Sequence, residues 1–180
     1  MANRYWVGGA GTWDASSTTH WSAASGGAAG ASAPNSTDTA IFDAASAAAN
    51  YTVSIAATAT CANCTIANPT GGVITAQLSG SPTFTGGLTF TSGKLDLANN
   101  VLTVRDVSSS NSNTRTIAVG VGKIIVTGSS RIVWNVYIAT GLTITGTPLV
   151  EANYSGSTGT RTVSHGNTGS GGTAANAISF

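Results

Sequence analysis

Charge is the scarcest property of this 180-residue chain. Only 7% of its residues are charged, against about 25% in an ordinary soluble domain. Seven Lys and Arg balance six Asp and Glu, which leaves a formal net charge of +1. The basic residues are scattered along the chain, so the sequence offers no basic patch for nucleic acid. A hydrophobic fraction of 41% argues against a disordered chain.

Long apolar runs are also missing. No stretch approaches the roughly 18 consecutive apolar residues of a membrane helix. The first residues, MANRYWVGG, lack the apolar segment of a secretory signal peptide. We therefore expect neither a membrane partner nor export through a cleaved signal.

Cysteine occurs only twice, as Cys61 and Cys64 in TCANCT. A C-x-x-C pair can be a redox centre, but no helical pattern follows it as a thioredoxin-like unit requires. A zinc site would need further soft ligands, and His20 and His165 lie far away in the sequence. We expect two small buried thiols, with a local disulfide or redox pair as the alternative, and neither a metal nor a cofactor.

Short β-type segments make up most of the chain from Tyr51 onward. Runs such as YTVSI, GVITAQL and RIVWNVYI are rich in Val, Ile, Thr and aromatic residues and are separated by Gly, Pro or Asn. Apolar residues do not recur with a helical period over any long window. The sequence predicts an all-β protein, and a single helical turn capped by Asp43 in DAASAAAN is the one helix candidate.

Apolar residues recur at a period near twenty in this region. Val73, Leu95 and Ile117 are 22 residues apart, Leu102 and Ile124 repeat that interval, and Ile144 follows 20 residues later. Several brief strands per period of 20–22 residues predict a β-solenoid, in which stacked coils share one apolar interior. A β-sandwich, which also has short strands and frequent turns, is the alternative.

The chain divides into two regions at this level. Residues 1–45 form a Trp- and Gly-rich module with three of the four tryptophans, and residues 46–180 form the β-repeat body. Because a terminal coil exposes unpaired backbone, we expect the module to cap the first coil or to anchor the chain to a partner. The C-terminal part has no such module, so we expect the repeat to continue past Phe180 or to be covered by another chain.

Three of the tryptophans stand seven and eight residues apart, with glycines between Trp6 and Trp13. This spacing predicts that Trp6, Trp13 and Trp21 meet in one small core. An exposed platform that stacks on sugars is the alternative. If the core interpretation holds, Trp13 and Trp21 are more buried than Trp134.

Catalytic signatures are weak, and we expect no enzyme. The β-repeat body has three acidic residues: Asp96, Asp106 and Glu151. Each of the two aspartates has a basic neighbour, Lys94 or Arg105, so solvated ion pairs are expected in place of a glycosidase pair. No G-x-S-x-G elbow is present, and the glycines of WVGGAGTW lack the Lys-Ser/Thr of a phosphate loop. Both histidines lie in loop-like stretches, where we expect surface or hydrogen-bonding roles.

The stretch RYWVGGAGTWDASSTTHWS and the residues after it resemble the N-terminal motif of a group of tailed-bacteriophage virion proteins. That motif reads W-x-G-G-x-G-x-W-D, followed by a W-S pair, a Gly-rich tract, a Pro and a D-x-A/V-I-F-D strand. The matching positions are Trp6, Gly8, Gly9, Gly11, Trp13, Asp14, Trp21, Ser22, Pro34, Asp38, Ile41, Phe42 and Asp43. The later segment GTRTVSHGN is also similar to a segment of such proteins.

The resemblance implies a structural component of the virion: a fibre, a tail-associated protein or a capsid-decorating protein. It implies capsid, neck or tail proteins as partners, a homo-oligomer such as a trimer, and assembly onto the particle in the host cytoplasm. Residues expected to pack or anchor the module are Trp6, Gly8, Gly9, Trp13, Asp14, Trp21 and Phe42. The alternative function is a β-helix module that binds host-surface polysaccharide through an outer face or through aromatics such as Trp134 and Tyr137.

Overall fold

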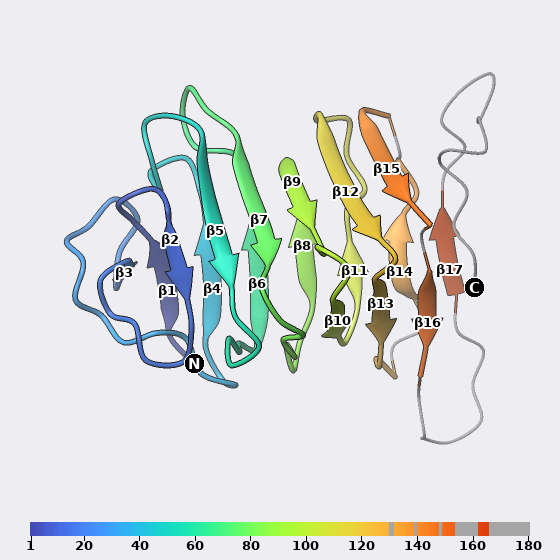
Figure 1. The fold of residues 1–180 in the computed structure, drawn as a ribbon, viewed down its shortest axis with the longest axis horizontal. Helices are drawn as coiled ribbons and strands as arrows, with labels where there is room; N and C mark the ends of the chain where they lie inside the picture. The colour runs from blue at the N-terminus through green and yellow to red at the C-terminus, as the bar shows by residue number, and fades with distance from the viewer. Residues whose placement is uncertain (130–131, 139, 148, 154–161, 166–180) are drawn as a thin grey trace.

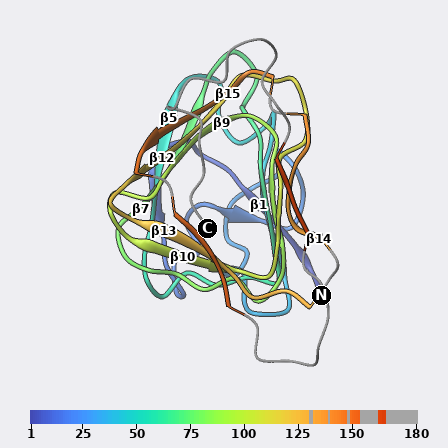
Figure 2. The same cartoon turned by 90° about the vertical axis from the view of Figure 1, so that its right-hand side faces the viewer.

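The computed structural model describes residues 1–129, 132–138, 140–147, 149–153 and 162–165. The described chain is an all-β solenoid of about 5 turns, without any helix. Its coils follow one another along the long axis from the N-terminus (Figure 1). The view along that axis shows the strands stacked into walls around one shared interior (Figure 2). The solenoid prediction is thus confirmed, and the β-sandwich alternative is excluded.

Three sheets form these walls, and the later coils pass through sheets A, B and C in turn. Sheet A contains β1 (Asn3–Trp6), β3 (Trp21–Ser22), β4 (Thr39–Phe42), β6 (Asn63–Ile66), β8 (Leu88–Phe90), β11 (Val107–Ser108), β14 (Ile132–Val136) and β17 (Thr162–His165). Sheet B contains β2 (Gly11–Trp13), β5 (Tyr51–Ile55), β7 (Ile74–Leu78), β9 (Gly93–Asp96), β12 (Arg115–Gly120) and β15 (Leu142–Gly146). Sheet C contains β10 (Val101–Val104), β13 (Lys123–Val126) and β16 (Val150–Ala152).

Neighbouring strands are parallel in all three sheets, with one exception at the N-terminal end. There β3 pairs antiparallel with β1, and Trp6 lies opposite Trp21. On its other side β1 pairs parallel with β4, while β2 pairs parallel with β5. Residues 1–22 therefore supply the first coil of the same sheets, and β3 closes the outer edge of sheet A.

Side chains alternate between the interior and the surface along each strand. In β5, Tyr51, Val53 and Ile55 are buried, while Thr52 is exposed and Ser54 is partly exposed. Successive side chains of a strand point to opposite faces. Stacking therefore brings the inward residues of every coil into one continuous core.

The predicted repeat is right for two of its pairs. Leu95 is the register partner of Ile117 in sheet B, and Leu102 is the partner of Ile124 in sheet C. Both pairs are 22 residues apart. Each places one buried apolar side chain directly above another.

The same repeat is wrong at both of its ends. Leu95 pairs with Ala76 on its other side, and Val73 is 45% exposed at a corner. Ile144 pairs with Ile117, 27 residues earlier. The spacing changes because corners differ in length: two residues separate β8 from β9, whereas residues 109–114 separate β11 from β12.

The predicted helical turn at Asp43 is also wrong, because the segment forms a turn without a helix. The carboxylate of Asp43 accepts a hydrogen bond from the N–H of Ala45 at 2.9 Å. The N–H of Ser46 donates to the carbonyl of Asp43 at 3.1 Å. Asp43 therefore closes a tight turn at the start of the segment between β4 and β5 by bonding to the backbone locally.

Candidate functional site

The N-terminal end of the solenoid holds a cluster of four large aromatic side chains. Trp6, Trp13, Trp21 and Phe42 are each 0% exposed. The ring of Trp21 meets Trp6 at 5.1 Å and Trp13 at 5.3 Å, both edge to face. Phe42 lies 5.6–5.8 Å from all three indoles. These rings pack with one another, as the sequence spacing predicted, and do not form an exposed platform.

The cluster continues into the body of the solenoid through Phe84. The ring of Phe84 stacks on Trp13 at 5.3 Å with an interplanar angle of 16°, and it is 2% exposed. Phe84 follows Thr83, which bridges to Thr103 in sheet C. The aromatic first coil therefore shares its core with later coils.

The side chain of His20 explains why the motif has glycine at positions 8 and 11. Its ring stacks on Trp6 at 4.7 Å with an interplanar angle of 7°, and its Nδ1 lies 2.9 Å from the carbonyl of Val7. A Cβ atom at Gly11 would lie 2.5 Å from Nε2 of His20, and one at Gly8 would lie 3.3 Å from its Nδ1. Gly8 also has a φ of +84°, which L side chains rarely adopt. The turn between β1 and β2 is thus built of glycine so that the imidazole can lie against it.

Two further residues of the motif hold the backbone. The indole N–H of Trp6 donates to the carbonyl of Gly9 at 2.7 Å. The carboxylate of Asp14 accepts the N–H groups of Ser16 at 2.8 Å and Ser17 at 2.7 Å, and these bonds lower the pKa of Asp14. Asp14 therefore turns the chain immediately after β2.

Trp134 does not differ from the N-terminal tryptophans, contrary to the prediction. It is 1% exposed, because it takes an inward position of β14 in register with Val107. All four tryptophans are buried, so none can stack on a sugar. Tyr137 is 71% exposed and remains available to a ligand.

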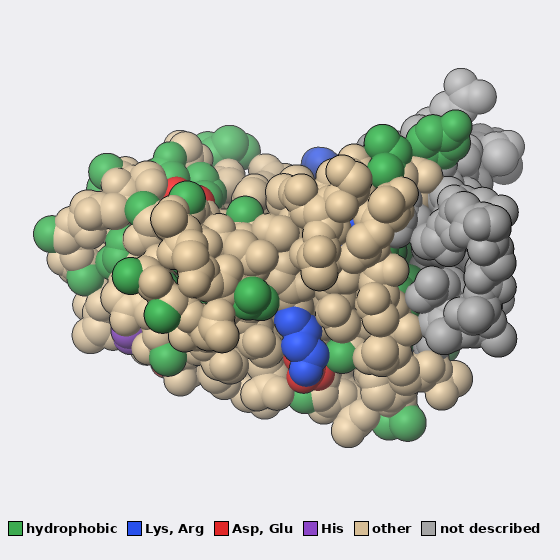
Figure 3. All heavy atoms as spheres, turned by 90° about the horizontal axis from the view of Figure 1, so that it is seen from above, with side chains coloured by type: hydrophobic (Ala, Val, Ile, Leu, Met, Phe, Trp, Pro, Cys, Tyr) green, Lys and Arg blue, Asp and Glu red, His purple; other side chains and the backbone are tan. Residues whose placement is uncertain are grey.

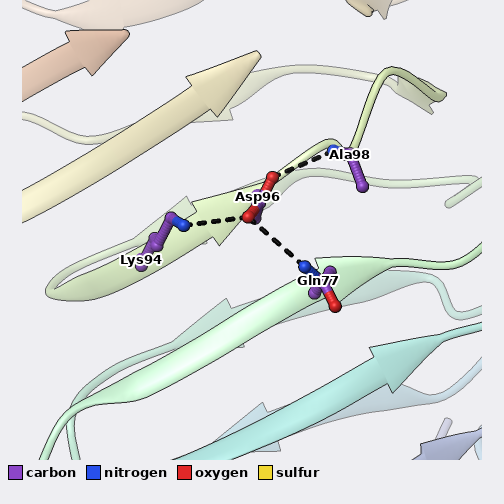
Figure 4. Close-up of polar contacts among 4 residues, drawn as sticks. All are labelled: Gln77, Lys94, Asp96 and Ala98. Atoms are coloured by element: carbon purple, nitrogen blue, oxygen red, sulfur yellow. Dashed lines mark hydrogen bonds and ion pairs between the residues drawn. The ribbon is translucent and has the colours of Figure 1, made fainter. Parts of the chain in front are cut away.

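The carboxylates of the body lie in separate ion pairs. Asp96 on the outer face of sheet B accepts bonds from Lys94 at 2.9 Å and Gln77 at 3.4 Å, as well as from the N–H of Ala98 at 3.0 Å (Figure 4). Burial acts to raise the pKa of Asp96, but the bonds from Lys94 and Ala98 outweigh it and the pKa is lowered. A carboxylate with a lowered pKa stays ionised near neutral pH, so it has no proton to donate as a general acid.

The other two acidic residues have partners of their own. Arg105 lies 2.6 Å from Asp106, and Lys123 lies 2.6 Å from Glu151. The predicted surface pairs of Lys94 and Arg105 are therefore present. No group of three or more His, Cys, Asp or Glu side chains in the described residues could hold a metal ion. His165 ends β17, and its side chain lies outside the described part.

Cys61 and Cys64 are free thiols, 0% and 1% exposed. Burial raises the pKa of Cys64 well above its ordinary value, and the neighbouring Cys61 thiol acts in the same direction. The thiolate is the reactive form of cysteine. The prediction of two small buried thiols is confirmed.

Arg115 is the residue that sequence reasoning missed. It is one of the scattered basic residues, for which the sequence suggests a surface position, yet it is 1% exposed at the inward-facing start of β12. Its Nε donates to the hydroxyl of Ser109 at 2.7 Å. Its two terminal nitrogens donate to the backbone carbonyls of Ser109 (2.5 Å), Asn113 (2.9 Å), Ile138 (2.7 Å) and Thr140 (2.9 Å). All five N–H groups of the guanidinium are thus bonded.

Every acceptor around Arg115 is a neutral oxygen, and no carboxylate in the described residues pairs with it. Burial lowers the pKa of Arg115 below its ordinary value. The sequence does contain a signal that Arg115 is buried. Alternate residues of a strand face the same side, and Ile117 and Val119, two and four residues after Arg115, face the interior.

A shallow hollow of about 740 Å³ lies beside the first coils, between residues 8–10 and residues 45–51. Its lining is mostly Gly and Ala and contains no charged side chain. Tyr51, also in the lining, has a buried hydroxyl without a well-formed hydrogen bond. Burial raises the pKa of Tyr51 to about 12, although the nearby Ser46 hydroxyl acts in the opposite direction. No carboxylate, histidine or cysteine side chain is present in the lining of the hollow.

Comparison with known proteins adds no relative from which function can be transferred. Searches against family models, curated proteins and solved structures found no significant match to the chain. In the described residues, no helix has the length and apolar character needed to cross a membrane.

Proposed function

We propose that this chain is a structural component of a tailed-bacteriophage virion, without catalysis. It would serve as a fibre, a tail-associated protein or a capsid-decorating protein, held by capsid, neck or tail proteins. The observation that carries the proposal is the place of the motif residues. Trp6, Trp13 and Trp21 of the first coil pack with Phe42 of β4 in one core, so the segment that resembles phage proteins forms the N-terminal end of the solenoid.

The surface of the molecule supports a structural role. The face in Figure 3 is mostly neutral, with few charged side chains. One outward row of sheet B places Thr52, Thr75, Lys94 and Thr116 in register, so three of these four side chains are short and polar. Because each coil contacts only its neighbours, a solenoid can be lengthened by adding coils. A solenoid can therefore keep two binding partners at a fixed distance from each other.

Oligomer formation is part of the proposal. A fibre built from this chain would be a homotrimer, as the family resemblance implies. Light scattering during size-exclusion chromatography of the purified chain would measure this directly, and a mass of three chains is the expected result. A monomer at micromolar concentration would remove the trimeric fibre and leave attachment as single copies.

Particle association is the decisive experiment. Virions of a phage that encodes the chain would be purified by density gradient, and their proteins quantified by mass spectrometry. The chain should sediment with the capsid at a fixed copy number, and Lys94 or Lys123 should cross-link to a capsid, neck or tail protein. An abundant host cytoplasmic protein serves as the control for carry-over. If the chain stays with that host protein in the soluble lysate, the proposal is wrong.

A further inference from the structure

Arg4 is a second arginine at an inward-facing position of a sheet. It lies in β1 in register with Ala40, which is 0% exposed, and residues in register point to the same face of a sheet. Unlike Arg115, Arg4 is partly exposed. Its strand, β1, belongs to the N-terminal end of the solenoid (Figure 1). The side chain of Arg4 is therefore directed inward at a place that another molecule can reach.

The guanidinium of Arg4 has no acceptor. Its Nε is buried without a hydrogen bond, and the side chain forms no ion pair within the described residues. The other basic side chains of that part of the chain are all bonded: Lys94, Arg105 and Lys123 to carboxylates, and Arg115 to five neutral oxygens. A buried donor that lacks its hydrogen bond destabilises the protein, so an acceptor brought by another molecule would stabilise Arg4.

The three carboxylates nearest to Arg4 in the sequence serve the backbone instead. Asp38 is 4% exposed and accepts the N–H of Ala2 at 2.8 Å. Asp14 and Asp43 accept N–H groups of their own turns. Within the described residues, none of the three pairs with Arg4. The acceptor for Arg4 therefore has to come from outside the described part of the chain.

The outer side of β1 is uncovered at Arg4. The register between β1 and β3 contains only Tyr5 and Trp6, opposite Ser22 and Trp21. On the inner side, the register with β4 continues through Arg4 to Asn3. β1 is thus the edge of sheet A at Arg4, among the strands that the structure describes. The edge of a strand is where another polypeptide can pair with its backbone.

The distribution of charge indicates which kind of anion fits. Between Arg4 and Lys94 the sequence contains neither Lys nor Arg. Nucleic acids and anionic membranes are bound through several cations together, which this end of the chain lacks. One guanidinium matches one carboxylate, because its planar fork can donate two parallel hydrogen bonds to the two oxygens. The open edge of β1 favours a carboxylate that is carried by a polypeptide.

We infer that Arg4 is a binding residue for the carboxylate of an Asp or Glu on another polypeptide that docks at the N-terminal edge of sheet A. For the identity of that polypeptide the inference rests on the proposed function, which makes it a capsid, neck or tail protein. Binding of a carboxylate at Arg4 is a property of the chain itself. It is therefore measured without particles, and its failure is distinguishable from a failure of virion association.

The first experiment uses the purified full chain and nuclear magnetic resonance of its arginine Nε–H groups. The probe is the peptide acetyl-Gly-Glu-Gly-amide, and acetyl-Gly-Gln-Gly-amide is the uncharged control. The signal of Arg4, assigned by its loss in Arg4→Lys, should shift saturably with the Glu peptide and stay unchanged with the Gln peptide. Arg105 is the internal comparison. Its dissociation constant for the Glu peptide should be at least about tenfold higher, because the peptide has to displace Asp106.

Three outcomes of this experiment would overturn the inference, whatever the virion contains. The first is no shift of the Arg4 signal with the Glu peptide. The second is an equal response to both peptides, since the carboxylate would then not be recognised. The third is an equal affinity at Arg105, since Arg4 would then bind no better than an exposed arginine that already has a partner.

The second experiment tests docking in virions of a phage that encodes the chain. Arg4→Met keeps an apolar side chain but removes the guanidinium, and it should lower the copy number per particle by about tenfold or more. Arg105→Met is the matched control and should assemble as wild type does. Because the guanidinium of Arg4 has no hydrogen bond to lose, Arg4→Met should unfold at the same urea concentration as wild type. This measurement separates a loss of docking from misfolding.

Arg4→Lys identifies the partner, because it places an amine at the docking position. In virions, a water-soluble carbodiimide should join this amine to the carboxylate of the partner as an amide, while the carbodiimide takes up the released water and becomes a urea. Peptide mass spectrometry then identifies both residues. Thr52→Lys is the control: it places an amine on the outer face of sheet B, and this amine should not form the same product.

The two experiments fail in different ways. If Arg4→Met assembles at the wild-type copy number, the inference is wrong while the proposed function stands. If the wild-type chain is absent from virions but its Arg4 signal shifts with the Glu peptide, the proposed function is wrong while the carboxylate site stands.

Discussion

Gly93 and Arg115 are register partners in β9 and β12, and both face the interior of the solenoid. A Cβ atom at Gly93 would lie 2.6 Å from Cγ2 of Ile74 and 2.8 Å from Oδ1 of Asn68. One coil later the same position holds an entire arginine. The difference follows from the corners that precede them, two residues in one coil and six in the next. In this pair, the glycine follows the shorter corner and the arginine follows the longer one.

The first prediction concerns the guanidinium that fills the wide corner. Arg115→Met should lower the free energy of unfolding by about 3 kcal/mol or more, because it leaves buried carbonyls without donors. Urea denaturation followed by circular dichroism measures this change. Arg115→Lys should fall between Met and wild type, since an ammonium group can still reach some of the same oxygens.

Arg105→Met is the matched control for this measurement. Arg105 pairs with Asp106 at the surface, and its side chain is 50% exposed. Exposed ion pairs contribute about 0–1 kcal/mol, so this variant should unfold close to wild type. Equal losses in the two variants would contradict the role given to Arg115.

The sequence could predict the class of fold, because alternation along the strands and a repeat of apolar residues are local signals. It could not predict the length of each corner. Val73 was placed in the repeat and lies exposed at a corner, and Ile144 was placed one sheet away from its true partner, Ile117. The end of each strand depends on its pairing with the neighbouring coils, which the residue pattern of a single coil does not show.

The candidate site was predictable in the same uneven way. The spacing of Trp6, Trp13 and Trp21 correctly indicated one core. The sequence predicts that Trp134 is less buried than Trp13 and Trp21, but the register with Val107 turns its side chain inward. The charge of Arg115 suggests an exposed side chain. Its position two residues before the inward-facing Ile117 indicates instead that its side chain points into the interior.

The second prediction tests the contact between Gly11 and His20. Gly11→Ala places a methyl group against the imidazole, so His20 must leave its stack on Trp6. We expect a loss of about 1–2 kcal/mol in unfolding free energy. Combining Gly11→Ala with His20→Ala should cost less than the sum of the two single changes, because the methyl group then has room. Simple additivity in urea denaturation would contradict the contact.

Gly86→Ala provides a comparison for this double-mutant experiment. A Cβ atom at Gly86 would collide with the backbone carbonyl of Ala62, which cannot rotate away as a side chain can. This substitution should be more destabilising than Gly11→Ala. Since the contact is with the backbone, truncation of a neighbouring side chain should not relieve it.

The third prediction concerns the four tryptophans. All are buried in the described structure, so acrylamide should quench the fluorescence of the folded chain far less than that of the unfolded chain. Neutral polysaccharide should leave this emission unchanged, since no indole ring is exposed to stack on a sugar. Efficient quenching in the folded state, or protection of tryptophan by a sugar, would support the exposed platform instead.

The fourth prediction concerns the two buried thiols. An aromatic disulfide reagent at pH 8 should react with Cys61 and Cys64 only when the chain unfolds, because both are inaccessible and burial disfavours the Cys64 thiolate. Reaction in urea at the same pH gives the full count of two and serves as the control. Rapid labelling of the folded chain would indicate a redox role and contradict this expectation.

The fifth prediction concerns stability in alkaline solution and Tyr51. Burial raises its pKa from the ordinary 10 to about 12, so the unfolded chain releases this proton at a lower pH than the folded chain. Folding stability from this group is complete below pH 10 and is lost as the pH rises toward 12. The loss should be about 1.4 kcal/mol for each pH unit above 10. Urea denaturation of wild type and Tyr51→Phe at several pH values isolates the effect. Below pH 10 the free energies of unfolding of the two proteins should differ by a constant amount. Above pH 10 the free energy of unfolding should fall faster for wild type. Parallel curves up to pH 11.5 would show that Tyr51 titrates normally, which is inconsistent with its burial.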